Sequence, residues 1–174
     1  SFGEQLLQRL QESVFRDARR ESLGSEVREM KTKIEQSIAA RGTEGIPLKW
    51  GSGGVMEIHF LIEYLQIFHG IVVGPQRDTL RMLSELHSRR LLTDDDYPML
   101  YAAYLLFRSL DHSMRLLYDK PGDFLPLTEG CLSRLANEIR LTLSSTRKAT
   151  ADSLLSLIEE SRRNVRECFH KTVI

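Results

Sequence analysis

Residues 49–60 read Lys49-Trp50-Gly51-Ser52-Gly53-Gly54-Val55-Met56-Glu57-Ile58-His59-Phe60, a glycine-rich loop that runs directly into an apolar helix. Three glycines in four residues permit positive φ and close approach by another group. The first turn of the following helix offers unpaired N–H groups and the positive end of the helix dipole, a geometry that can hold an anion. A tight turn between helices is the alternative interpretation, because the stretch matches neither the Walker spacing nor G-x-G-x-x-G.

Outward from this stretch, apolar residues recur every three or four positions, which is typical of amphipathic helices. After the 49–60 stretch we expect helices over about 55–69, ended by Gly70, over 79–90, capped by Asp78, and over 95–119. Before it we expect two helices separated by a break at Ser22–Ser25, and after it a sixth helix around 132–143, a polar connector at 144–148 and a last helix of about twenty residues ending near Phe169. Only 46–48 could be briefly extended, so the sequence predicts an all-α fold, an up-down helical bundle with additional packed helices, in which the helices at 55–69 and 95–119 are the most buried.

The length and charge of the chain limit its class. The 174 residues suit a single helical domain, with N-terminal helices in 1–44, the Gly-rich loop in 45–54 and the bundle in 55–174. Lys and Arg together number 24, as do Asp and Glu, so no overall basic field favours nucleic acid. No apolar run approaches the roughly 20 residues that span a bilayer, and two cysteines make no disulfide framework. We therefore expect a cytoplasmic protein without a nucleic-acid or membrane partner, and the missing initial Met suggests a piece of a longer protein.

The pattern over 49–60 is Lys, an apolar residue, Gly-x-Gly-Gly, an aliphatic residue and, after one position, Glu-Ile. It resembles a signature in the helical domains of glutamine synthetase adenylyltransferases, where the domain follows a nucleotidyltransferase domain. The likeness continues through 61–66, 79–86, 91–94, 102–108 and His112, and it spans roughly residues 27–169. Where the family has a basic and a second acidic residue, this chain has Met56 and His59, which leaves a specialised or degenerate half-enzyme possible.

This resemblance implies a parent enzyme that transfers AMP from ATP to a tyrosine of glutamine synthetase, or removes it by phosphorolysis, in nitrogen regulation. ATP and magnesium are implied for the full-length protein, and no cofactor is implied for this chain. The implied partners are the nucleotidyltransferase domain of the same polypeptide, glutamine synthetase and a PII signalling protein. The domain would cap the catalytic cleft, with an interdomain or nucleotide-facing loop formed by Lys49, Gly51, Gly53, Gly54 and Glu57, the last at the edge of the buried face.

We expect no catalytic or metal-binding residue in this chain. A nucleotidyltransferase needs carboxylates that hold two metal ions, and the family supplies them as Gly-Ser followed about ten residues later by Asp-x-Asp. The first aspartate after Gly51-Ser52 is Asp78, and the run 94–96 is explained by helix capping. The histidines show no metal spacing. Two other interpretations stay open: a stand-alone helical interaction or regulatory module, and the corresponding domain of a PII uridylyltransferase.

Overall fold

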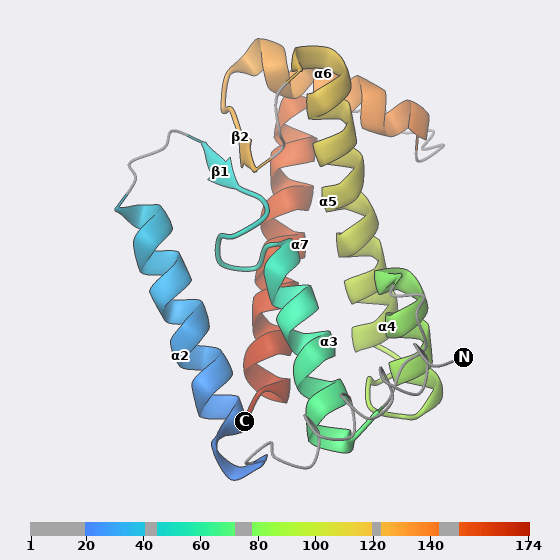
Figure 1. Ribbon diagram of the computed structural model, residues 1–174. Helices are drawn as coiled ribbons and strands as arrows, with labels where there is room; N and C mark the ends of the chain where they lie inside the picture. Colours follow the sequence, from blue (N-terminus) through green and yellow to red (C-terminus); the bar gives the residue numbers. More distant parts are fainter. Residues whose placement is uncertain (1–19, 41–44, 72–77, 120–122, 143–149) are drawn as a thin grey trace, which may run out of the picture.

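The computed structural model describes residues 20–40, 45–71, 78–119, 123–142 and 150–174. Its elements are α2 (Arg20–Ala39), β1 (Ile46–Pro47), α3 (Val55–His69), α4 (Thr79–Ser88), α5 (Asp96–Tyr118), β2 (Phe124–Leu125), α6 (Glu129–Thr142) and α7 (Ala151–Thr172). Helices α2, α3, α5 and α7 lie side by side and alternate in direction in chain order, so that the neighbours α3 and α7 run the same way, while α6 lies across one end and α4 packs beside α3 and α5 (Figure 1). The all-α, up-down prediction is confirmed. No described helix is both long and apolar enough to cross a membrane.

The core lies where α7 packs against α3, α5 and α6. Among its largest fully buried side chains are Phe107 and Leu110 of α5, Phe169 of α7, and Leu61 of α3. The apolar spacing along α3 and α5 correctly placed both helices in the core. Helix α7 is equally central, with Ile158, Val165 and Phe169 all fully buried. Burial of such side chains contributes on the order of 1.5–3 kcal/mol each.

A short ladder ties the glycine-rich loop to the connection between α5 and α6. Ile46 pairs with Leu125 and Pro47 with Phe124 in antiparallel register, and the Leu48 N–H donates to the Asp123 carbonyl at 3.0 Å. The extended conformation expected at 46–48 is present, whereas its partner strand at 124–125 was not anticipated. Leu48, 1% exposed, anchors the start of the loop in the core.

The expected break at Ser22–Ser25 is wrong, because α2 runs through it without interruption. The Ser25 hydroxyl donates to the Ser22 carbonyl at 2.7 Å, and the Ser22 hydroxyl donates to Glu26 at 2.7 Å, so both serines bond along the helix instead of ending it. Gly24 lies against the C-terminus, where a Cβ would meet the Ile174 carbonyl oxygen at 1.7 Å. Tertiary packing therefore explains this glycine. The helix expected around Leu6 and Val14 and the connector at 144–148 lie outside the described residues.

Candidate functional site

The glycine-rich loop satisfies the first donors of α3 with its own carbonyl groups. The N–H groups of Val55, Met56 and Glu57 donate to the carbonyls of Leu48, Lys49 and Gly54 at 3.0, 3.0 and 3.1 Å. The first N–H groups of a helix are unpaired unless another group accepts from them, and the sequence suggested that an anion could do so here. In the structure, carbonyl groups of the loop already accept these hydrogen bonds.

Gly53 connects the loop to both α3 and α7. Its N–H donates to Glu57 Oε1 at 2.9 Å, so a carboxylate of the chain itself takes the place of a bound anion. Its φ is +69°, and a Cβ would lie 2.0 Å from the Arg162 carbonyl oxygen of α7. Both the left-handed conformation and the close approach to the α7 backbone require glycine at this position.

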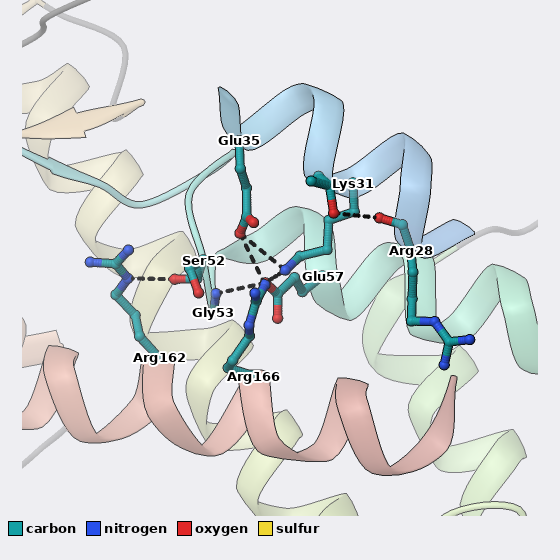
Figure 2. Close-up of polar contacts among 9 residues, drawn as sticks. Arg28, Lys31, Glu35, Ser52, Gly53, Glu57, Arg162 and Arg166 are labelled. Atoms are coloured by element: carbon teal, nitrogen blue, oxygen red, sulfur yellow. Dashed lines mark hydrogen bonds and ion pairs between the residues drawn. The ribbon is translucent and has the colours of Figure 1, made fainter. Parts of the chain in front are cut away.

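Glu57 lies at the centre of a buried charge network that we call the Glu57 junction, made of Lys31, Glu35, Gly53, Glu57 and Arg166 (Figure 2). Glu57 is 1% exposed, and its Oε1 contacts the Lys31 ammonium and accepts from Arg166 Nη1 at 2.8 Å. Glu35 Oε1 lies 3.0 Å from both of these cations. Two carboxylates and two cations therefore alternate between α2, α3 and α7.

The junction extends to the exposed side of the loop through Arg162, whose Nε donates to the Ser52 carbonyl at 2.9 Å (Figure 2). One turn before Lys31 in α2, Arg28 Nη1 donates to the Val173 carbonyl at 2.8 Å. Helix α2 is thus attached to the bundle largely through polar and charged contacts, with Leu23 and Val27 as its apolar contacts to the core.

Burial dominates the electrostatics of the junction. It raises the pKa of Glu57 to about 8; the nearby Glu35 charge also raises it, whereas the Gly53 N–H and Arg162 lower it. All the donors converge on Oε1, and Oε2 is buried without a hydrogen-bond donor among the described residues. Burial likewise raises the pKa of Glu35 and lowers the pKa of Arg166. Burial therefore favours the protonated form of Glu57 at neutral pH, and the network carries all four charges only above about pH 8.

The structure separates the five residues that the sequence grouped in this loop. Gly51, Gly53, Gly54 and Glu57 are buried, and Glu57 lies deeper than the edge position predicted for it. Lys49 faces outward with its side chain 45% exposed, 3.8 Å from Asp123 and with its ammonium 5.3 Å from the centre of the Trp50 ring. An interdomain or nucleotide-facing role for the loop stays a prediction. The residues that could fulfil it are those on the exposed side of the loop, Lys49, Trp50 and Ser52.

Sequence reasoning did not identify Lys31, Glu35 and Arg166 as partners of Glu57, nor Arg162 as a partner of the loop. Arg163 is exposed, but Arg162 is only partly so and bonds the loop. A weak signal existed, because Lys31 and Glu35 are four residues apart on the side of α2 that carries Val27. Nothing in a single sequence joins residue 57 to residue 166.

The other candidate sites have structural explanations. The Thr93 hydroxyl accepts from the Asp96 N–H at 3.0 Å, which confirms the capping interpretation of the acidic run, and Asp96 pairs with Lys171 at 3.0 Å. His59 lies 3.3 Å from the Thr79 hydroxyl, between α3 and α4. No group of three or more His, Cys, Asp or Glu within the described ranges could hold a metal ion.

Comparison with known proteins places these features in a family. A family model described as GlnD PII-uridylyltransferase matches residues 28–173. The chain is 29% identical, over 98% of its length, to a bifunctional glutamine synthetase adenylyltransferase/adenylyl-removing enzyme of Acinetobacter baylyi, of which it covers 18%. Enzymes of the same name from Hahella chejuensis (29% identical over 92% of the chain) and Mannheimia succiniciproducens (32% over 59%) are covered to 18% and 11%. The chain therefore spans less than a fifth of the length of these relatives.

Proposed function

The chain belongs to the GlnD PII-uridylyltransferase family of domains, and from that premise we propose that it is the helical accessory domain of a bifunctional glutamine synthetase adenylyltransferase. One observation carries the proposal: the Acinetobacter baylyi relative matches 98% of the chain with only 18% of its own length. The chain thus corresponds to one domain-sized part of a much longer enzyme. Its role would be to cover the nucleotidyltransferase unit and to position the protein substrate.

The internal bonding of the loop supports an accessory role over a catalytic one. Glu57 is shielded from solvent and bonded to Gly53 and Arg166, so it cannot reach a nucleotide unless α2 or the loop moves. The junction instead fixes α2, α3 and α7 relative to the loop. A loop held in this way presents Lys49 and Ser52 in a defined position, and such preorganisation lowers the entropy cost of docking.

The chemistry then belongs to the rest of the polypeptide. ATP and magnesium would bind the nucleotidyltransferase unit, because transfer of AMP needs metal ions that neutralise the phosphates. Glutamine synthetase would be the protein substrate, a PII protein the regulator and the cytoplasm the location. This chain would need no cofactor of its own.

A second candidate is the equivalent domain of a PII uridylyltransferase, and the description of the matching family model favours it. The two candidates differ in the nucleotide and the acceptor protein of the parent enzyme. The geometry of the chain serves either one, since both place the catalytic carboxylates outside it.

The test uses the complete polypeptide that contains this chain, incubated with magnesium and either radiolabelled ATP and glutamine synthetase or radiolabelled UTP and PII. We expect label on glutamine synthetase from ATP, and none when the 174-residue chain is supplied alone. Label on PII alone would establish the second candidate. No transfer by the complete polypeptide would favour a stand-alone module, and transfer by the isolated chain, abolished by a point change within it, would contradict an accessory role.

A further inference from the structure

The outer side of α2 carries an apolar stripe that no described helix covers. Met30, Ile34 and Ile38 recur every four residues, and Trp50 of the loop lies beside them in an open groove of about 610 Å³. Met30 is 47% exposed. Figure 1 shows α2 at the edge of the bundle, and its inner side contacts α3 and α7.

Leu23 and Val27 face the core in the usual way, but from Met30 onward α2 reverses the arrangement of a typical surface helix, which turns its apolar stripe inward and its charges outward. In α2 the buried Lys31 points into the Glu57 junction, while Met30 faces out. The stripe of Met30, Ile34 and Ile38 is therefore left uncovered by the other residues that the structure describes. A contiguous exposed apolar patch with a polar rim is typical of an interaction site.

We propose that this groove docks an apolar segment, with basic residues on its flank, from the nucleotidyltransferase unit of the same polypeptide. The inference rests on the proposed function, and three observations favour the nucleotidyltransferase unit as the occupant of the groove. More than four-fifths of the length of the relatives lies outside the chain, so a large covalently linked partner is available. Trp50 makes the groove continuous with the exposed side of the glycine-rich loop. The groove rim carries Glu26 and Glu29 against a single cation, Lys33.

Covalent linkage also explains why a groove of this size suffices. A docking contact within one polypeptide forms at a high effective concentration, so it needs fewer contacts than association between separate molecules. Domain interfaces within a chain are accordingly modest in area.

The proposal is tested by photo-crosslinking in the complete polypeptide, with benzoylphenylalanine introduced at position 30 and, as the matched control, at position 116. Leu116 is an exposed apolar residue of α5 outside the groove, 66% exposed. We expect position 30 to crosslink to a segment of the nucleotidyltransferase unit with a yield that does not depend on protein concentration, and position 116 not to crosslink to that segment. A concentration-dependent crosslink to a second copy, a crosslink to added glutamine synthetase alone, or no crosslink outside residues 1–174 would each overturn it.

Ile34→Glu supplies the second arm, with Leu116→Glu as its control. A charge in an apolar contact should lower the crosslink yield and the AMP transfer by about tenfold, whereas Leu116→Glu should change neither. If Ile34→Glu unfolds the protein, Met30→Glu replaces it in the activity assay. Wild-type transfer with no effect of either groove variant would refute the groove and leave the proposed function standing, whereas absent wild-type transfer would refute the function and leave the crosslink to be judged separately.

Discussion

Helix α5 and the Glu57 junction are both buried, but they are held in opposite ways. The inward face of α5 is apolar, with Leu100, Phe107 and Leu110 at most 1% exposed. At the junction, the similarly buried Lys31 of α2 and Glu57 of α3 meet Glu35, also of α2, and Arg166 of α7. The first region is stabilised by removal of apolar surface from water, and the second depends on mutual neutralisation of charges that burial disfavours.

This difference predicts how substitutions destabilise each region. An apolar face loses stability in proportion to the volume removed, because neighbours relax only partly around a cavity. A charge network fails when its balance is broken, since the remaining charge is left desolvated without a partner. The junction therefore contributes a defined geometry for the loop more than it contributes net stability.

The largest effect should come from unbalancing the junction. Glu57→Leu removes the acceptor that the Gly53 N–H, Lys31 and Arg166 share, and at pH 6, where burial keeps Glu57 protonated, it should lower the free energy of unfolding by about 3–5 kcal/mol. Urea unfolding followed by circular dichroism measures the loss. A loss below that of an exposed substitution such as Leu116→Ala would mean that the contacts of Glu57 are not maintained in solution.

In the apolar core, Leu110→Ala should lower the free energy of unfolding by about 2–5 kcal/mol, because Leu110 is fully buried. The loss should be independent of pH, in contrast to that of the junction variants. The same urea titration with Leu116→Ala as control checks it, and equal effects of the two substitutions would show that the buried face of α5 is wrongly placed.

Gly53→Ala tests the contact between the loop and α7. The left-handed φ alone disfavours alanine by about 1–3 kcal/mol, and its Cβ would overlap the Arg162 backbone. Gly130→Ala in α6 is the matched control, since a Cβ there meets nothing within 4 Å and alanine should be neutral or stabilising. Thermal unfolding of both variants decides the matter: similar melting temperatures would contradict the tight packing of the loop on α7.

The most gradual effect is the dependence of the free energy of unfolding on pH. Burial raises the pKa of Glu57 from 4.5 to about 8, so the folded state binds its proton more tightly than the unfolded state does. The contribution of this group to stability is then complete below pH 4.5 and is lost as the pH rises through 8, with a slope of at most about 1.4 kcal/mol per pH unit. The stability of the wild type relative to Glu57→Gln should fall between pH 4.5 and 8 and level off above. If the stability of the wild type relative to Glu57→Gln instead rose with pH, the attraction of Lys31 and Arg166 for the Glu57 carboxylate would outweigh the effect of burial.

Local patterns predicted much of the fold. The apolar spacing from Ile58 to Leu65 and the terminating Gly70 specify α3, and Gly70 indeed adopts the left-handed conformation. These signals are contained within a few turns of one helix, so they can be recognised in a single sequence. The same reasoning failed at Ser22–Ser25, because the role of Gly24 depends on a contact with Ile174, 150 residues away.

The candidate site was predictable only in part, for a related physical reason. The spacing of Gly53 and Glu57 marked the loop and the first turn of α3 as unusual. The pattern could not show that the carboxylate turns back onto the Gly53 N–H, since that choice depends on Lys31 and Arg166 arriving from α2 and α7. The tertiary partners, and not the motif, determine that Glu57 points inward.

The most direct test of the coupling between Lys31 and Glu57 is the double variant Lys31→Met with Glu57→Leu, measured at pH 6 beside the two single variants. Removing one cation and one carboxylate leaves Glu35 paired with Arg166, so the double variant should lose much less stability than Glu57→Leu alone and should lie within about 1 kcal/mol of the wild type. Losses that add, with the double variant as unstable as the sum of the two singles, would contradict the conclusion that Lys31 and Glu57 stabilise the junction through their mutual contact.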